Sequence, residues 1–162
     1  NNKVFKRKNR NLSSEIDANF LYKKVNYYMA DKNYKKLRDI GKDVERSIQF
    51  YKNGRVRFFS FGYTDPNPEI TGRRGIIYKK NGKIKIDTQF ANQSGDIFKG
   101  TYSVKIEGDY LFLLDDNFLV PRDEYICFVY KKSDERIPEE WNKYKADWQL
   151  LVIFQVCCFY YK

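Results

Sequence analysis

Three short segments of the chain share the pattern of a β-hairpin, and their spacing constrains the fold more than any other feature. They occupy residues 50–58, 78–86 and 104–112, with glycines at positions 54, 82 and 108. In the first two, Asn-Gly lies between β-branched and aromatic residues, which is a strong short-range signal for a hairpin turn. An interval of about 27 residues fits two strands of roughly ten residues with one tight turn and one looser return. The spacing therefore predicts an antiparallel up-and-down meander.

Hydrophobic alternation selects the turn type, because a shift of one residue exchanges the two faces of a strand. In the second hairpin, a three-residue loop with Gly82 in the left-handed conformation pairs Tyr78 with Ile84 and Ile76 with Ile86, and leaves the lysines outside. The same loop and bulge is expected at Gly54. It pairs Phe50 with Val56 and Ile48 with Phe58, and places Gln49, Tyr51, Arg55 and Arg57 outside.

Alternation through the remaining segments gives about eight strands, beginning near residues 20–28. Eight strands close into a barrel that side chains just fill, or that holds one small ligand. The expected inner face is rich in rings, so any pocket should be narrow, apolar and near one mouth. Its candidate ligand-binding residues are Phe50, Phe58, Tyr78, Phe90, Tyr102, Tyr110 and Phe112, with Phe98 beside them.

The two ends of the chain carry less regular patterns. Residues 1–13 are expected to form a basic flexible tether and residues 14–162 one barrel domain. Residues 31–40 are predicted to be a partly helical connection. Pro138, Glu139 and Glu140 favour a helix start, and apolar residues at helical spacing extend it over about 138–148. Residues 150–161 are apolar and predict a buried terminal strand, with Cys157 and Cys158 as core or boundary residues.

The charge of the chain is concentrated near its start. The net charge is +10, and residues 1–46 hold 13 Lys/Arg against 6 Asp/Glu, a surplus of 7. A basic arm followed by strands that alternate aromatic and basic residues, such as Tyr51, Arg55 and Arg57, is compatible with single-stranded nucleic-acid binding. Solvated strand faces produce the same alternation, so nucleic acid is the less favoured partner.

The chain has no histidine and three cysteines, which removes several kinds of chemistry. A Ser-His or Cys-His nucleophile cannot form, and a four-ligand zinc site is disfavoured. Asp115-Asp116 is interpreted as a polar turn, Arg73-Arg74 as a solvated strand start, and Glu139-Glu140 as a helix start. We therefore expect no enzyme, no catalytic residues, no metal and no cofactor.

Residues across the hairpins resemble those of the lipocalin-like (calycin-type) small lipoproteins of Bacteroidetes-type bacteria. The resemblance rests on Phe-Tyr-Lys-Asn-Gly-Arg-Val at 50–56, Gly-Ile-Ile-Tyr at 75–78 and Ile-Pro-Glu-Glu-Trp at 137–141, and it covers roughly residues 17–148. The Gly-x-Trp of the classical first strand and a lipid-acceptor cysteine at the start are absent. The resemblance implies an exported domain of the cell envelope or periplasm, tethered to a membrane through a lipidated N-terminus that precedes this chain.

Three functions remain compatible with the sequence. The first is a non-catalytic exported binding barrel that holds a small apolar ligand or presents loops to a macromolecule. The second is a protein-interaction module of inhibitor or immunity type with a fully packed core. The third is a single-stranded nucleic-acid binder.

Overall fold

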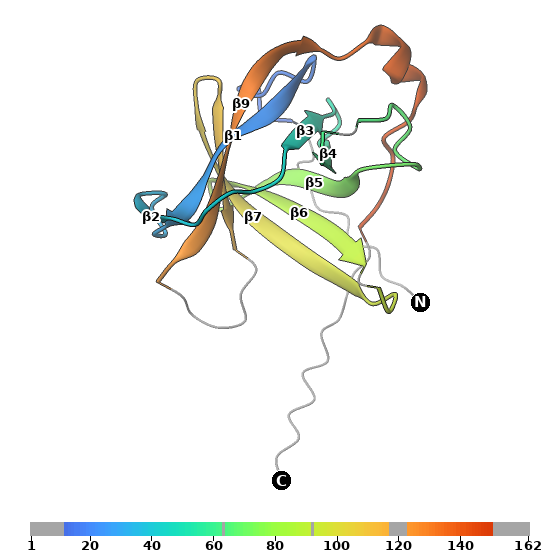
Figure 1. Ribbon diagram of the computed structural model, residues 1–162. Helices are drawn as coiled ribbons and strands as arrows, with labels where there is room; N and C mark the ends of the chain where they lie inside the picture. The colour runs from blue at the N-terminus through green and yellow to red at the C-terminus, as the bar shows by residue number, and fades with distance from the viewer. Residues whose placement is uncertain (1–11, 63, 92, 117–122, 151–162) are drawn as a thin grey trace.

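The computed structural model describes residues 12–62, 64–91, 93–116 and 123–150. Within this part of the chain, strands dominate and one short 3₁₀ helix follows them (Figure 1). The strands are β1 (Phe20–Ala30), β2 (Lys36–Asp39), β3 (Arg46–Phe50), β4 (Arg55–Ser60), β5 (Arg73–Lys80), β6 (Lys83–Ala91), β7 (Ile97–Glu107), β8 (Tyr110–Asp115) and β9 (Tyr125–Arg136), and the helix is η1 (Glu139–Lys143).

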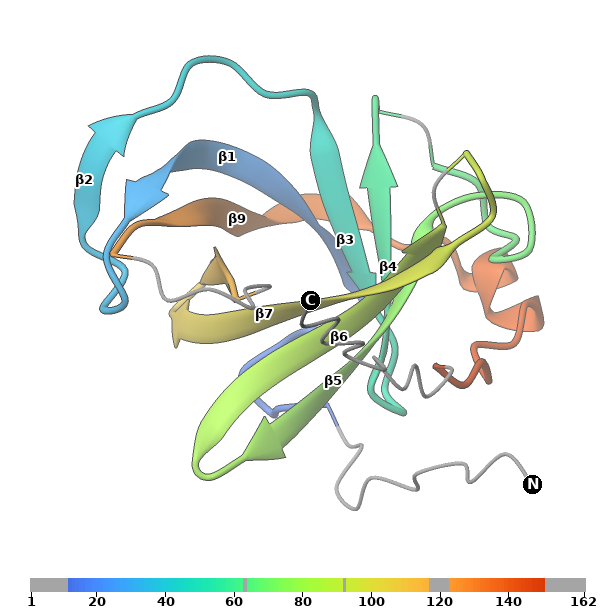
Figure 2. The same cartoon turned by 90° about the horizontal axis from the view of Figure 1, so that it is seen from below.

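The sheet closes on itself as an antiparallel barrel of eight strands, which confirms the predicted fold. The strand order is β2-β1-β3-β4-β5-β6-β7-β8-β9, and β1 also pairs with β9 to complete the ring (Figure 2). The ninth strand, β2, pairs only with the end of β1 and lies outside the ring. Closure gives each of the eight barrel strands a hydrogen-bonded neighbour on both sides.

The connection at residues 31–40 was predicted to be partly helical, and this prediction is wrong. Asp31 Oδ1 accepts hydrogen bonds from the backbone N–H groups of Asn33 and Lys35 at 2.8 and 3.0 Å, and Tyr34 adopts a φ of +68°. These features form a tight turn rather than a helix start. The chain therefore returns antiparallel to β1 as strand β2.

The first hairpin has the predicted register. Phe50 pairs with Val56 and Ile48 pairs with Phe58. Gly54 has a φ of +80°, and its N–H donates to the carbonyl of Tyr51 at 2.9 Å. The three-residue loop with a left-handed glycine is therefore confirmed.

The second hairpin does not have the predicted register. Tyr78 pairs with Lys85 and Ile77 pairs with Ile86, because the loop contains only Asn81 and Gly82. Their φ values of +51° and +74° are those of a type I′ turn. Ile77 consequently points into the barrel and Tyr78 out of it, the reverse of the prediction. Both Ile76 and Tyr78 are nevertheless buried, so β5 is apolar on both faces and its alternation does not determine the register.

The core fills the end of the barrel at which β1 begins and β3 ends. Before β1, Ile16 is buried in the main core cluster and Leu12 packs against it; residues 1–11 of the predicted tether lie outside the described residues. Strand β8 faces inward with Leu111 and Leu113, not with Tyr110 and Phe112 as predicted. Besides Ile16, the cluster contains Tyr22, Ile48, Phe50, Val56, Phe58, Ile77, Ile86, Tyr102, Val104, Leu111, Leu113 and Tyr130.

The segment after β9 packs over the β3–β4 turn and the outer face of β4 and β5 (Figure 2). The predicted helix over 138–148 is reduced to the single turn η1, and residues 144–150 follow without regular structure. Trp148 Nε1 donates to the Gly75 carbonyl at 3.0 Å, and Asn53 Nδ2 donates to the Ala146 carbonyl at 2.7 Å. Residues 139–150 therefore act as a cover on the barrel. The predicted terminal strand with Cys157 and Cys158 lies outside the described residues.

Beneath this cover lie basic side chains that were expected to be solvated. Arg55 and Arg57 point out of the barrel as predicted, but they are buried. Arg57 is 0% exposed; its Nη2 donates to Gln49 Oε1 at 2.8 Å and its guanidinium lies 4.5 Å from the centroid of the Phe59 ring. Burial lowers the pKa of the Arg57 guanidinium, and its Nε and Nη1 have no hydrogen-bond partner.

Candidate functional site

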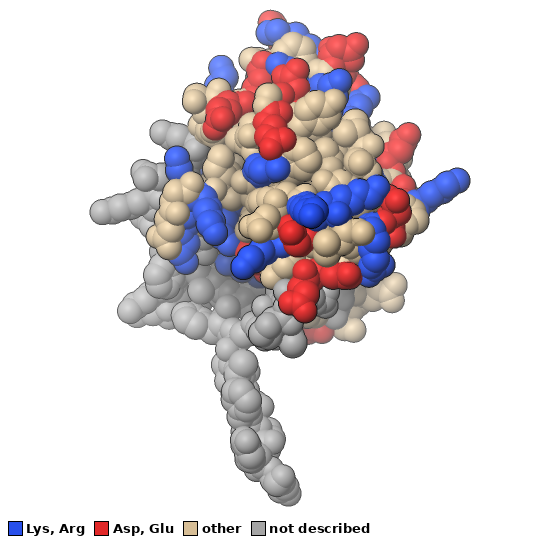
Figure 3. All heavy atoms as spheres, turned by 90° about the vertical axis from the view of Figure 1, so that its left-hand side faces the viewer, with Lys and Arg blue, Asp and Glu red and all other residues tan. Residues whose placement is uncertain are grey.

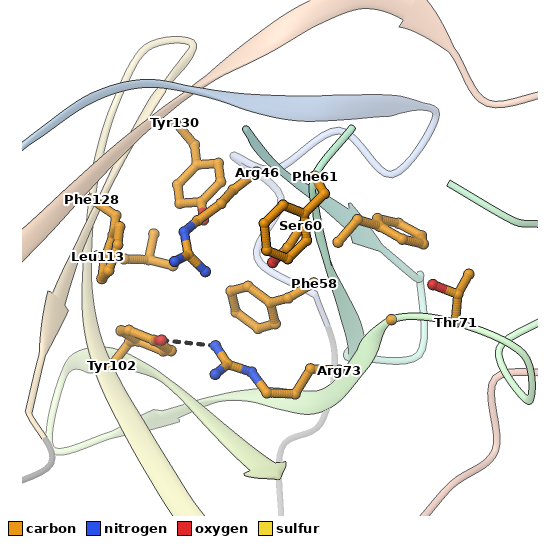
Figure 4. A pocket seen from close by; sticks show the side chains of 12 residues that line it. Arg46, Phe58, Ser60, Phe61, Thr71, Arg73, Tyr102, Leu113, Phe128 and Tyr130 are labelled. Atoms are coloured by element: carbon orange, nitrogen blue, oxygen red, sulfur yellow. Dashed lines mark hydrogen bonds between the residues drawn. The ribbon is translucent and has the colours of Figure 1, made fainter. Parts of the chain in front are cut away.

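A cavity of about 390 Å³ opens at the opposite end of the barrel, where β3 and β5 begin and β4 ends (Figure 4). Aromatic rings and two arginines form most of its wall, and none of the lining residues that the structure describes is acidic. Its volume lies within the range of small-molecule sites. The lining residues are Arg46, Phe58, Phe59, Ser60, Phe61, Thr71, Gly72, Arg73, Tyr102, Leu113, Phe128 and Tyr130.

The inner wall of the cavity is apolar and packed. Phe58 and Tyr102 lie with ring centroids 5.7 Å apart, and the Phe128 ring meets Tyr102 edge-on at 6.1 Å. Tyr130 is buried, and this burial raises the pKa of its phenol above the ordinary range. The hydroxyl of Tyr130 is therefore protonated at neutral pH and can donate a hydrogen bond into the cavity.

Arg46 enters the cavity from the first position of β3 and is held by an acid outside it. Its Nε and Nη2 donate to the two carboxylate oxygens of Asp43 at 2.8 and 3.1 Å. Lys24 also pairs with Asp43. The hydrogen bond from Arg46 is the largest cause that lowers the pKa of Asp43. Arg46 is thus paired with an acid, and its position is fixed by a two-pronged contact.

Arg73 enters from the first position of β5 and is held differently. Its Nη2 donates to the Tyr102 hydroxyl at 2.8 Å, and its guanidinium lies 5.1 Å from the centroid of the Phe58 ring. Its Nε is enclosed and has no hydrogen-bond partner. In the described part of the chain, no acidic side chain forms an ion pair with Arg73, so its charge is held by rings and one hydroxyl alone.

An apolar lip extends from the mouth beyond the barrel. Phe90 and Phe98, which lie opposite each other on β6 and β7, stack with centroids 5.5 Å apart and are 42% and 44% exposed. The Arg73 guanidinium lies 5.9 Å from the Phe90 ring, so the lip begins beside the cavity. Phe61, Ile70 and Ile97 are also exposed on the loops and strand ends of this side. Phe61 has a φ of +61°, an uncommon conformation for a bulky residue.

The structure separates the residues that were predicted to line a pocket. Phe58 and Tyr102 line the cavity, Phe50 packs in the core against Tyr22, and Phe90 forms the lip. The other three point out of the barrel: Tyr78 because of the two-residue turn, and Tyr110 and Phe112 because Leu111 and Leu113 are the β8 residues that pair with the inward-facing Ile106 and Val104. Tyr78 Oη donates to Asp87 Oδ1 at 2.9 Å, Tyr110 is exposed, and Phe112 lies under the Lys105 ammonium at 4.5 Å. Whether any of the seven binds a ligand stays a prediction.

Both cavity arginines were missed as site residues. Arg73 was interpreted as a solvated strand start, yet it lies four positions before the inward-facing Ile77 and therefore on the same strand face. Arg46 lies in the same way two positions before Ile48. The alternation of residues along each strand could have placed both arginines on the inner face. For Arg73, however, this required the correct register of the second hairpin. Asp116 accepts hydrogen bonds from Lys85 and Ser103, as expected of a polar turn.

Comparison with family models, curated proteins and solved structures finds no match. The closed antiparallel barrel is compatible with the lipocalin-like fold that the sequence resemblance implies. Among the described residues, no cluster of His, Cys, Asp and Glu is arranged to bind a metal ion. No helix in the same part of the chain is long and apolar enough to cross a bilayer.

Proposed function

We propose that this chain is a non-catalytic binding domain whose barrel holds one small, largely apolar ligand at its mouth. The observation that carries the proposal is the cavity of about 390 Å³ lined by Phe58, Tyr102 and Phe128. The opposite end is filled by the core and by Ile16, so a ligand would enter and leave at the lip. A concave, mostly apolar site with a few polar groups is the usual form of a small-molecule site.

The polar groups of the cavity support binding more than catalysis. A general base must be deprotonated and within reach of the proton that it removes. Here the titratable groups are two guanidinium groups and the phenols of Tyr102 and Tyr130, and burial raises the pKa of Tyr130. Among the described residues, no carboxylate lines the cavity to act as base or nucleophile. These groups can orient a ligand and donate hydrogen bonds to it.

The expectation of an exported, membrane-tethered domain remains part of the proposal and rests on the resemblance alone. The exposed lip of Phe90 and Phe98 gives specific support to a second candidate, a protein-interaction module, because exposed apolar patches often mark protein contacts. Nucleic-acid binding has less support. On the described part of the face that bears β2, Asp and Glu lie among the Lys and Arg side chains, so no continuous basic track crosses that part (Figure 3).

A neutral fluorescent dye, N-phenyl-1-naphthylamine, tests the proposal. We expect a saturable rise in dye fluorescence that is nearly unchanged between low and physiological salt, because apolar contacts are not screened. Ser60 points into the cavity (Figure 4), so Ser60→Trp should abolish binding. Ser103→Trp, on the outer face of β7, is the matched control and should bind like the wild type.

Failure of the dye to saturate, or equal binding by the Ser60→Trp variant, would overturn the proposed function. Titration with single-stranded DNA tests the alternative in the same buffers. Nucleic-acid binding that weakens steeply with salt, in the absence of dye binding, would favour the nucleic-acid function, because phosphate contacts release counterions.

A further inference from the structure

We propose that the ligand of this cavity is a small apolar acid, and that Arg73 binds its single carboxylate group. The inference rests on the proposed function, since it assigns the chemical class of the ligand in the same cavity. It is carried by a difference between the two arginines that enter the mouth: Arg46 is paired with an acidic side chain, whereas Arg73 is paired with none among the described residues. Figure 4 shows both guanidinium groups in the cavity, one from β3 and one from β5.

The local charge balance leaves a positive surplus at the mouth. Asp43 is shared by Arg46 and Lys24, so one carboxylate already serves two cations. Arg73 adds a third positive charge, with no ion pair in the described residues and no acid in the cavity wall. A guanidinium taken partly out of water loses hydration that one phenol hydroxyl and ring faces replace only in part. An anionic group entering the cavity would supply the missing interaction.

The geometry favours a carboxylate over a larger anion. A carboxylate has two oxygens that match two adjacent N–H groups of a guanidinium. The Arg46 fork is occupied by Asp43 through Nε and Nη2, so the cavity does not offer two free forks as a phosphate dianion would require. Tyr130, whose phenol stays protonated, can add one neutral donor. One guanidinium and one hydroxyl fit a single carboxylate.

The surroundings of Arg73 indicate where the rest of the ligand lies. Phe58 and Tyr102 flank the guanidinium inside the barrel, and Phe90 lies 5.9 Å from it on the outer side. An acid bound at Arg73 would therefore place its apolar part against the inner rings or along the lip formed by Phe90 and Phe98. This arrangement gives a function to two exposed, stacked rings that the barrel itself does not bury.

Competition between a matched acid and amide tests the inference. 2-Naphthoate and 2-naphthamide are titrated into the full chain saturated with N-phenyl-1-naphthylamine, and displacement is followed by fluorescence. Hydrogen bonds to a charged partner exceed neutral ones, so we expect the acid to bind roughly tenfold more tightly than the amide, or better. Arg73→Gln should remove this preference while amide and dye binding persist. Arg74→Gln, in a residue that faces outward and pairs with Glu69, should retain it.

The acid-to-amide ratio of the wild type needs no variant, so the test remains decisive if Arg73→Gln fails to fold. Arg73→Lys, which keeps the charge, should then show an intermediate preference. If the dye binds and the two naphthalene probes displace it equally, the carboxylate assignment is wrong and the binding function stands. If the dye and both probes fail to bind, the proposed binding function is wrong, and the carboxylate assignment that rests on it is wrong as well.

Discussion

Replacing Gly82 by valine tests the backbone geometry of the β5–β6 turn. Gly82 has a φ of +74°, and a Cβ atom at this position would meet nothing within 4 Å. The cost is therefore conformational and not steric. The left-handed region costs an L-residue about 1–2 kcal/mol, and a β-branched residue lies at the upper end. The loss of glycine entropy in the unfolded chain offsets roughly 0.4–1 kcal/mol, so we expect a net destabilisation of about 1 kcal/mol.

Urea unfolding at equilibrium measures this change. An unchanged slope of the unfolding free energy against urea concentration would show that the variant and the wild type expose similar surface when they unfold. Asparagine tolerates the left-handed region, so Gly82→Asn should cost only a few tenths of a kcal/mol by the same reasoning. Gly75→Ala provides a contrast, because φ is ordinary there but the added Cβ would lie 2.8 Å from the Asp87 carbonyl oxygen. Equal costs for Gly82→Asn and Gly82→Val would refute the assignment of strain to the left-handed turn.

Three further predictions follow from buried groups. Arg46 lowers the pKa of Asp43 in the folded state, so the stability that Asp43 contributes is complete above about pH 5 and is lost as the pH falls below about 4. Asp43→Asn should weaken the dependence of the urea midpoint on pH between pH 2 and 6. A variant whose midpoint depends on pH as strongly as that of the wild type would contradict this. Trp148→Ala should cost about 3 kcal/mol because Trp148 is 8% exposed, whereas Trp141→Ala, at a less buried position, should cost clearly less in the same assay. Burial raises the pKa of the Cys127 thiol to about 11, so a variant with serine at the other two cysteines should not react with Ellman's reagent at pH 8 until urea unfolds it. Reaction of the folded variant would show that the Cys127 thiol is accessible.

Turn chemistry made the fold predictable from the sequence. Asn-Gly at residues 53–54 specified both the first hairpin and its register, because only one pairing left Phe50 opposite Val56 on an apolar face. The interval between the glycines then implied the meander, and the number of strands implied closure. These features depend on residues close together in the chain, which is why sequence patterns capture them.

Long-range packing made the second hairpin and the site unpredictable. Ile76, Ile77 and Tyr78 are all buried, because the barrel core covers one face of β5 and the segment around Trp148 covers the other. Alternation identifies an inner face only when the outer face meets water. The same ambiguity applies to β8, where Leu111 and not Phe112 faces inward. Charged residues are rarely assigned to an interior, so a single residue such as Arg73 could not be placed in the cavity until the register was known.

The seam between β1 and β9 determines when the barrel can close during synthesis. Phe20 pairs with Arg136 and Lys23 pairs with Lys131, so nearly the whole barrel must be made before its first strand finds its partner. All-β chains dominated by such distant pairs fold on the order of milliseconds to seconds, while ribosomes add only about 5–20 residues per second. A nascent chain therefore exposes the β1 edge for several seconds.

The residues of β1 and β9 protect these strands from aggregation during the time before the barrel closes. Lys23 and Lys24 on β1 and Lys131 and Lys132 on β9 place positive charge along both unpaired edges, and charged edges discourage pairing with other chains. After closure, Glu135 pairs with Lys23 and Asp109 pairs with Lys132, which offsets the repulsion of lysines brought opposite one another. The seam thus combines protection against aggregation before closure with ion pairs that form once the ring is complete.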